Sequence, residues 1–437
     1  MKIFLVPSLR YINLAYQFPA LFKITYFYVT LNLPFFIARR YLANQKGTFS
    51  FIIRLAVLAT GLSVAVMILS LAVTTGFKDA VKSKLYSFSG HVHVTYFDPI
   101  KSNALTTPPI YYDKKLVAAM EHIPHVTAVT PFAQRPVILQ CHSKMEGVRL
   151  KGVDKNYHFS KNMRLSGSLI DYSDTAYSRQ IMLSERTADL LDVRSGDTVL
   201  LEFFESGATP RLRKVRVAGM FHSGMEDVDK YYAICDIRLL QHINKWGADS
   251  INAYQLDLDN EAYADTVSNY IHYNLVDAPI DSITTAETNG GLFDWLGLQS
   301  MNSSILLIIM ALVAIINISG VILVLMVDRA TMVGLLKALG MNFRSTVYVF
   351  MSIGGIIGFA GIILGNIMAL TLCWAQQTYA LFKLDERVYF MKFVPVKVIW
   401  WHVIATDISA LLLFVLCLWL PALYIRRIQP AKVLQFK

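Results

Sequence analysis

Three long apolar runs constrain this chain more than any other feature of its sequence. They cover residues 55–75, 305–327 and 346–374. Each run is at least about 20 residues long, and a helix of that length crosses roughly 30 Å of hydrocarbon with its backbone hydrogen bonds made internally. A fourth run, residues 398–425, contains His402 and Asp407, so the part of it that faces lipid is narrower than its length.

The composition agrees with a membrane protein. Of the 437 residues, 54% are apolar and 16% are charged, which is richer in apolar residues and poorer in charge than ordinary soluble domains. We therefore predict an α-helical membrane protein with four transmembrane helices. Their predicted bounds are residues 51–76, 301–327, 346–374 and 399–425.

The charges orient these helices. Residues 1–54, 328–345 and 426–437 together hold 14 Lys or Arg and one Asp, whereas the remaining residues hold 27 Lys or Arg and 30 Asp or Glu. Lys and Arg beside membrane spans stay on the cytoplasmic side, so both termini and residues 328–345 are predicted to be cytoplasmic. Residues 77–300 and the short loop 375–398 are then extracytoplasmic. The net charge of +10 reflects this topology and not nucleic-acid binding.

Residues 77–300 have soluble character and are enough for one large or two small domains. Strand patterns occur at residues 91–96, 128–130, 137–140, 148–153, 198–204 and 215–219. Helical patterns occur at residues 115–121, 184–191 and 237–243. We predict a large α+β domain between helices 1 and 2, with a hairpin over residues 199–219. The first span is predicted to continue as a helix through residues 78–85.

Residues 1–33 leave several interpretations open. The segment is apolar, but Pro7 and Pro19 interrupt it, and Arg10 and Lys23 lie inside it. It is an interfacial helix, an extra span or the product of a start codon assigned too early. We favour the interface, because a fifth span would place the basic N-terminus outside. Residues 34–50 are predicted to form an amphipathic helix on the cytoplasmic face.

Residues 328–345 form a short, charged connection that cannot cross the membrane. Apolar residues recur there at i, i+3, i+4 and i+7, which makes one apolar stripe on a helix. The helix either docks a soluble partner, which would then push on two membrane helices together, or rests on its own bundle as an ordinary loop helix. The stripe consists of Met332, Leu335, Leu336 and Leu339. The candidate docking residues are Met332, Val333, Gly334, Leu335, Leu336, Lys337, Ala338, Leu339, Gly340 and Met341.

Small residues recur on one face of the third span. They are Gly354, Gly358, Gly361 and Gly365. A spacing of four lets a neighbouring helix approach closely, so we predict helix packing there rather than a pore lining. In the fourth run, Asp407 is either a functional intramembrane acid or a residue that faces a polar partner or the outer interface.

The sequence holds no motif for catalysis or nucleotide binding. It contains no phosphate-binding loop, no H-E-x-x-H helix, no G-x-S-x-G elbow and no C-x-x-C pair. The weakly spaced candidates for a metal site are His91 with His93, and His222 with Glu226 and Asp229. Strand alternation and a solvated loop explain these groups better, so no metal site is predicted. Cys141 and Cys235 either form a disulfide or stay unpaired and buried.

One span, a large outer domain and three further spans make a layout that resembles the FtsX-like, or MacB-type, permeases of ABC systems. Residues 334–341 are similar to the G-I-L-K-A-L-G-A pattern of their coupling helix, and Pro430 with Ala431 resembles the start of their P-A-x-x-L tail. Over residues 34–437, the chain most resembles the LolC/LolE lipoprotein-releasing permeases. The matching motifs are residues 38–41, 75–77, 152–154, 193–197, 222–224 and 394–396.

Two positions depart from the family pattern. Met332 stands where members commonly carry Glu early in the coupling helix, which puts the contact with the ATPase in question. The hairpin over residues 203–213 lacks the longer insertion with which LolC-type members hook the periplasmic lipoprotein carrier. The chain is more similar to LolE there, and the sequence leaves open whether this hairpin binds a carrier.

The resemblance implies a permease that is not itself an enzyme and binds no cofactor. A separate dimeric ABC ATPase, carrying ATP and Mg²⁺, would dock on residues 332–341 and move the first two spans together with the outer domain. The implied partners are a second permease in a homodimer or heterodimer, a periplasmic lipoprotein carrier, the lipoprotein substrate and membrane lipid, with no nucleic acid. The implied location is the bacterial inner membrane, multi-pass, with both termini cytoplasmic.

Two other functions fit the same layout. One is a MacB-like efflux permease, and the other is an FtsX-like signal transducer that transports nothing and controls a cell-wall hydrolase. The long outer domain and the motifs at residues 222–224 and 394–396 favour lipoprotein release over both. The sequence identifies neither the substrate nor the dimer partner.

Overall fold

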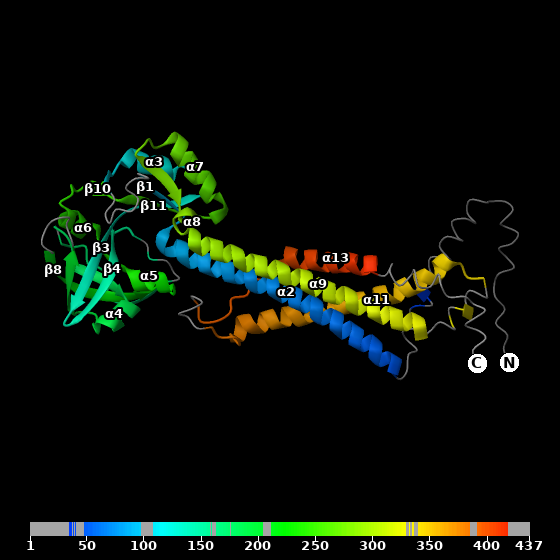
Figure 1. The fold of residues 1–437 in the computed structure, drawn as a ribbon. Coiled ribbons are helices and arrows are strands. Elements are labelled where there is room, and N and C mark those ends of the chain that lie inside the picture. Colours follow the sequence, from blue (N-terminus) through cyan, green and yellow to red (C-terminus); the bar gives the residue numbers. More distant parts are fainter. Residues whose placement is uncertain are drawn as a thin grey trace. The chain divides into compact units, whose positions relative to one another are not determined.

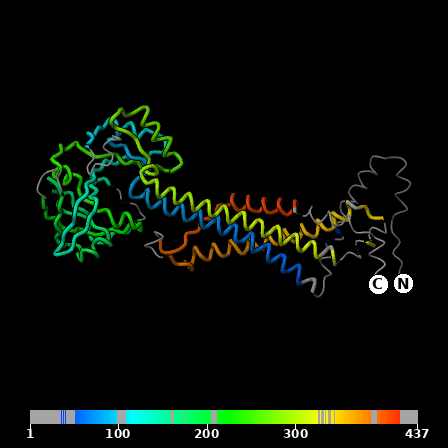
Figure 2. Tube along the Cα trace, viewed as in Figure 1, coloured from blue at the N-terminus to red at the C-terminus, as the bar shows by residue number. Residues whose placement is uncertain are grey.

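The chain divides into two compact units (Figures 1 and 2). The computed structural model describes residues 48–97, 108–157, 159, 163–174, 176–203, 211–328, 340–384 and 391–417, with residues 35, 36, 38, 40, 332, 334 and 335. The helical unit comprises Met1–Thr75, Ser300–Tyr379 and Val396–Lys437, and the α+β unit comprises Gly76–Gln299 and Ala380–Pro395. The predicted segments 1–33 and 426–437 lie outside the described residues, as does most of 34–50.

Four helices carry the apolar runs. They are α2 (Thr48–Ser89), α9 (Gly290–Asp328), α11 (Phe343–Tyr379) and α13 (Trp400–Cys417). Three helical segments are long and apolar enough to cross a membrane, namely Phe51–Ser89, Gly290–Val324 and Arg344–Tyr379. The described part of α13 has 18 residues and ends at Cys417, so the fourth span over 399–425 stays a prediction.

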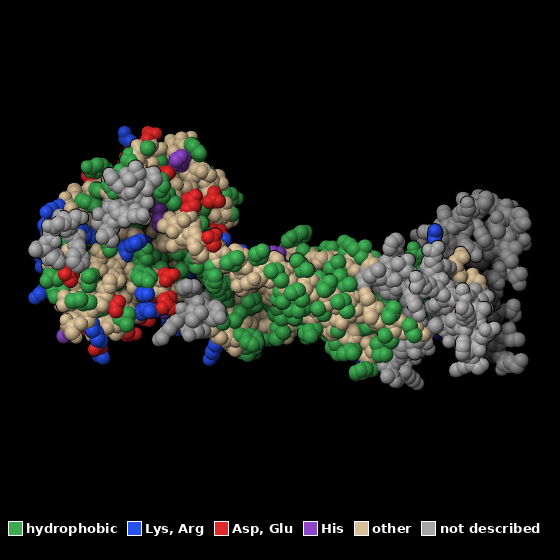
Figure 3. All heavy atoms as spheres, in the orientation of Figure 1, with side chains coloured by type: hydrophobic (Ala, Val, Ile, Leu, Met, Phe, Trp, Pro, Cys, Tyr) green, Lys and Arg blue, Asp and Glu red, His purple; other side chains and the backbone are tan. Residues whose placement is uncertain are grey.

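The surface of the described helices is apolar. In Figure 3, hydrophobic side chains cover the helices, whereas Lys, Arg, Asp and Glu gather on the α+β unit. On α9, Ile308 is 70% exposed and Ile316 is 61% exposed. An apolar surface of this extent is stable against hydrocarbon but not against water, in agreement with a membrane protein.

The helices α2 and α9 extend beyond the apolar runs. α2 continues without a break for 42 residues as far as Ser89, which confirms the predicted helical continuation over residues 78–85. α9 begins at Gly290, ahead of the apolar run 305–327. Both helices therefore contribute residues to both units.

Two glycines allow α11 to approach α2 closely. A Cβ atom built at Gly361 would lie 2.7 Å from the side chain of Thr60, and one built at Gly365 would lie 2.6 Å from the backbone oxygen of Gly61. Real Cβ atoms do not approach other atoms this closely, so any larger residue would push the two helices apart.

A third glycine, Gly358, faces α13. A Cβ atom there would lie 2.9 Å from the Phe414 ring, which is itself 2% exposed. Gly354 is also buried. These glycines lie beside the main buried cluster of the helical unit, which includes Ile68 of α2 and Phe350 of α11. The bundle is therefore packed through small residues where helices cross and through large apolar residues between the crossings.

One large sheet dominates the α+β unit. Its strands are β1 (Val92–Tyr96), β3 (Val126–Cys141), β4 (Lys144–Val153), β5 (Arg164–Gly167), β6 (Gln180–Ser184), β7 (Thr198–Phe203), β8 (Arg211–His222), β9 (Tyr232–Asp236), β11 (Ala253–Leu258) and β12 (Ile280–Thr284). Their order is β12-β1-β11-β3-β4-β9-β6-β8-β5, and β7 pairs with β3 and β8. The pairs β4–β9 and β6–β8 are parallel. A separate pair joins β2 (Ile110–Tyr111) to β10 (Ser250–Ile251).

Short helices cover this sheet. They are α3 (Lys114–Glu121), α4 (Glu185–Leu191), α5 (Glu226–Tyr231), α6 (Ile237–Asn244), α7 (Ala264–Asn274) and α8 (Thr285–Thr288), with the 3₁₀ turn η1 (Glu261–Tyr263). Side-chain caps begin several of them: Asp113 accepts a bond from the first turn of α3, Ser184 from that of α4 and Asp236 from that of α6. The main core includes Leu240 of α6 and Tyr254 of β11, both fully buried.

The strand β3 is longer than the sequence pattern predicted. Residues 128–130 and 137–140 were expected as two strands, but they belong to a single strand of 16 residues that contains Pro131 and Pro136. β3 changes partner along its length, pairing with β11 up to Phe132 and with β4 from Phe132 onward. β7 pairs with β3 only at residues 138–140, so each proline lies where β3 has a neighbour on one side only, the setting in which a strand tolerates a missing N–H.

The close approach of α11 to α2 predicts that a side chain added at Gly365 will lower the stability of the bundle. Gly365→Val is expected to destabilise the protein by about 1–3 kcal/mol, because the new side chain would overlap the Gly61 backbone and Val64. Gly355→Val on the same helix is the matched control, because no atom lies within 4 Å of a Cβ built there. Thermal unfolding of the two variants in detergent would measure the difference. Equal loss of stability in both would contradict the packing.

Candidate functional site

The helices α2 and α9 contact each other in both units (Figure 1). In the helical unit, Ser70 Oγ and Ser303 Oγ are 2.9 Å apart and hydrogen-bonded. In the α+β unit, the rings of Phe77 and Trp295 meet edge to face with centroids 5.5 Å apart, and Leu296 is buried in the same cluster. The two helices therefore pack against each other within each of the two units.

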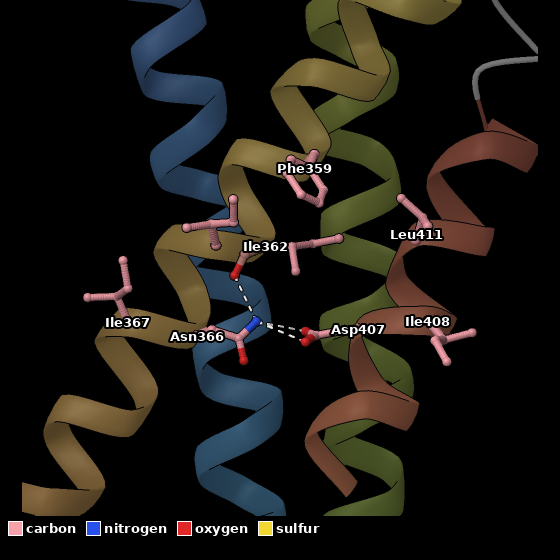
Figure 4. Close-up of a pocket in the computed structure, with 8 residues that line it drawn as sticks. Phe359, Ile362, Asn366, Ile367, Asp407, Ile408 and Leu411 are labelled. Carbon is pink, nitrogen blue, oxygen red and sulfur yellow. Dashed lines mark hydrogen bonds between the residues drawn. The ribbon is translucent and has the colours of Figure 1, made fainter. Parts of the chain in front are cut away.

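A polar pair joins α11 to α13 within the apolar helices (Figure 4). The Asn366 side-chain amide donates to both carboxylate oxygens of Asp407, at 2.9 and 3.0 Å, and to the Ile362 carbonyl at 3.0 Å. An acid in hydrocarbon needs such a donor, because it is costly to leave without a partner. Asp407 thus has a polar partner, which is one of the alternatives that the sequence left open. Asn366 was not predicted from the sequence, although it is a polar residue inside an apolar run.

The pair lies in an open groove between α11 and α13 (Figure 4). The groove has a volume of about 370 Å³. Apart from Asn366 and Asp407 it is lined by Phe359, Ile362, Ile363, Ile367, Ile408 and Leu411. Its walls offer van der Waals contact to an apolar chain and one hydrogen-bonding point, and the described residues that line it include no second acid and no histidine for acid–base chemistry.

The connection between α9 and α11 is described only in part. Of the ten candidate docking residues, Val333, Leu336, Lys337, Ala338 and Leu339 lie outside the described residues. Met332 and Met341 pack against the core of the helical unit, whereas Leu335 is 52% exposed. Gly334 is buried, and Gly340 has a φ of 89°, a conformation that glycine adopts readily. Among the described docking residues, Leu335 is thus the apolar side chain most available to a partner.

The predicted hairpin over residues 199–219 is confirmed. β7 and β8 are antiparallel neighbours, with Thr198 opposite Arg216 and Phe203 opposite Arg211. Their connection, residues 204–210, lies outside the described residues.

The residues considered as weak candidates for a metal site are not arranged as metal ligands in the described part of the chain. His222 Nδ1 lies 3.1 Å from Asp229 Oδ2, but Glu226 pairs with an arginine instead. Burial raises the pKa of Asp229, and the backbone N–H of Ser223 donates to it at 2.8 Å. His91 and His93 bond backbone atoms. Within the described ranges, no group of three His, Cys, Asp or Glu side chains could hold a metal ion.

The two cysteines of the α+β unit are not joined. Cys141 and Cys235 are both free and buried, so the unpaired interpretation holds. Burial raises the pKa of the Cys235 thiol well above its usual range, which keeps it protonated and unreactive.

Two protein families match the sequence. Residues 54–272 match the MacB-like periplasmic core domain, which is half of the chain, and residues 304–430 match the FtsX-like permease C-terminal domain. The first match begins within α2 and includes most of the α+β unit, and the second lies mostly within the helical unit.

Individual relatives match almost the whole chain. The lipoprotein-releasing system transmembrane protein LolC of Xylella fastidiosa is 24% identical over 94% of this chain and 98% of its own length. The corresponding protein LolE of Haemophilus influenzae is 24% identical over 92% of this chain and 99% of its own length. The crystal structure of the periplasmic region of MacB from Actinobacillus actinomycetemcomitans covers 46% of this chain and 92% of its own, with 12% identity and a TM-score of 0.33.

The bond between Asn366 and Asp407 can be tested by a double-mutant cycle. Asn366→Leu is expected to destabilise the protein, because it leaves the Asp407 carboxyl without its donor. The double variant Asn366→Leu with Asp407→Leu should recover part of that loss, with a coupling of about 0.5–2 kcal/mol. Unfolding of the four proteins in the same detergent gives the coupling. Strict additivity would show that the two side chains do not interact.

Proposed function

This chain belongs to the family of permeases that join a MacB-like periplasmic core domain to an FtsX-like permease domain, and we propose that it releases lipoproteins from the inner membrane. The observation that carries the proposal is its similarity to LolC and LolE over more than nine-tenths of both lengths. The permease would be the transmembrane subunit of an ABC transporter.

The proposed topology has four spans. α2, α9 and α11 supply three, and α13 would continue beyond Cys417 to complete the fourth, as the apolar sequence to residue 425 allows. Both termini and the α9–α11 connection would lie in the cytoplasm of a bacterium, because those segments carry the excess of Lys and Arg. The α+β unit would then lie in the periplasm.

ATP hydrolysis would take place in a separate ABC ATPase, since the chain has no phosphate-binding loop. ATP and Mg²⁺ would be bound by that subunit, which would dock on residues 332–341. The exposed Leu335 supports an apolar contact there, and the connection leads directly into α9 and α11.

The movement produced by ATP hydrolysis would be transmitted to the α+β unit through α2 and α9. Both helices contribute to the helical unit and to the α+β unit, and they contact each other in each unit. External energy is needed because each buried CH₂ contributes roughly 0.8 kcal/mol to anchoring, so a multiply acylated protein does not leave the bilayer at a useful rate unaided.

A second permease would complete the transporter. In its most apolar stretch, α9 is 17% buried inside this chain, compared with 50% for α2 and 44% for α11, so it has the most surface left for a partner or for lipid. The partner would be a second copy or a related permease. A periplasmic lipoprotein carrier would receive the substrate, although the short β7–β8 hairpin offers less surface for hooking it than a longer insertion would.

Depletion of the protein in its own host tests the proposed function. Envelope fractionation should show a triacylated lipoprotein, normally destined for the outer membrane, retained in the inner membrane. Normal sorting, in a strain shown to lack a second copy of the system, would exclude lipoprotein release and leave efflux or cell-wall control to be examined.

A charge in the docking helix tests the ATPase contact. Leu335→Glu is expected to reduce the amount of ATPase that co-purifies at least tenfold, because a carboxylate would be desolvated in an apolar contact. Leu190→Glu, on the 45% exposed leucine of α4, is the matched control and should co-purify normally. If both variants retain the ATPase, residues 332–341 are not its docking site.

A further inference from the structure

A lysine lies buried at the end of α2, inside the α+β unit. Lys151 of β4 is 1% exposed, which is rare for a lysine. Its ammonium group donates to the Phe88 carbonyl at 2.6 Å and to Gln255 Oε1 at 2.8 Å. The described residues give it no ion pair within 4 Å, so its charge is balanced by carbonyl dipoles and not by a bonded carboxylate.

Aromatic rings surround the same ammonium group. Nζ lies 4.4 Å from the centroid of the Phe88 ring and 5.2 Å from those of Phe132 and Tyr157. Ring faces attract cations, and more strongly where water is excluded. The three rings therefore add to the attraction that the Phe88 carbonyl and Gln255 Oε1 exert on the ammonium group.

The lysine also satisfies the end of a helix. The last carbonyls of a helix have no partner within it, and a cation is favoured there by the helix dipole. In α2, the Phe88 carbonyl accepts from Lys151 and the Ser89 carbonyl is bonded by His93 of β1. Burial lowers the pKa of His93 to about 4, so His93 is neutral near pH 7. Burial also lowers the pKa of Lys151, to about 7, while nearby Asp257 opposes that change.

Two lysines in the last turns of α2 also bond residues of other elements. Lys82 forms an ion pair with Glu261 of η1 at 2.8 Å, and Lys84 donates to the Gly224 carbonyl at 3.0 Å. Both of these lysines are partly exposed, so water can replace their bonds at little cost. Lys151 differs because it approaches from the middle of the sheet and is shielded from water.

We infer that Lys151 is a positioning residue that fixes the end of α2 to the centre of the sheet, so that the last turns of α2 and the sheet move as one body. A buried cation is a costly way to fill space, and a well-packed apolar side chain would serve stability as well. An apolar side chain could not bond the Phe88 carbonyl, however, and only a directional bond resists sliding of the helix end along the sheet. The role in transport rests on the proposed function, but the attachment itself does not.

Hydrogen exchange tests the attachment directly, whatever the protein transports. Lys151→Met in the full chain is expected to raise amide exchange in residues 84–90 at least tenfold, with the central strands β3 and β11 unchanged. Lys144→Met, at the exposed end of the same strand, should change neither. Unchanged exchange at residues 84–90, or equal acceleration throughout the sheet, would overturn the inference. Gln255→Met keeps the bond between Lys151 and Phe88, so it should raise amide exchange in residues 84–90 by less. This variant replaces Lys151→Met in the experiment if Lys151→Met fails to fold.

Coupling measurements test the role in transport. In the complex reconstituted with its ATPase, Lys151→Met is expected to keep ATP hydrolysis within twofold of the unmodified protein while lipoprotein release per ATP falls at least tenfold. An equal fall in both, or unchanged release per ATP, would overturn the positioning role. If the unmodified complex releases no lipoprotein at all, the proposed function fails, and the exchange experiment still decides whether Lys151 holds α2.

Discussion

The unbroken backbone of α2 is the constraint on which the rest of the structure depends. Its 42 residues extend about 60 Å at 1.5 Å per residue, and every interior carbonyl is bonded within the helix. Such a helix cannot bend sharply without losing those bonds, so its neighbours must adapt to it. In the helical unit α11 does so by presenting Gly361 and Gly365, and in the α+β unit the sheet does so by bonding the carbonyls of the last turn.

Each unit contains a polar group in apolar surroundings, which is destabilising unless it has a hydrogen-bond partner. In the helical unit Asn366 supplies the donor that Asp407 needs, and in the α+β unit Lys151 supplies the donor that the Phe88 carbonyl needs. In each case the partner comes from another element, because a helix has no spare backbone donors along its length. Such bonds join elements at one position and in one orientation, which apolar packing alone does not ensure.

The positions of these bonded residues along the chain explain which features the sequence could predict and which it could not. The apolar runs predicted the long helices, and the turn between two strand patterns predicted the β7–β8 hairpin, because both signals are local. β9 and β11 were missed, since both faces of these strands are buried and no alternation marks them. Asn366 and Asp407 are 41 residues apart, and Lys151 and Phe88 are 63 apart. No local pattern signals bonds at that separation, although a lone Asn in an apolar run was a usable sign.

Under the proposed function, the apolar surface of α9 limits how a lipoprotein could be recognised. Side chains such as Ile308 and Ile316 have the same affinity for hydrocarbon as the lipid tails around them, so exchanging bulk lipid for the acyl chain of a substrate gains almost nothing. Binding to such a surface cannot select a lipoprotein, nor can it supply the energy of extraction. Under the proposed function, selection would depend on the polar part of the substrate, and the energy would arrive as movement of the helices. The proposed attachment of the end of α2 to the sheet by Lys151 would serve to deliver that movement.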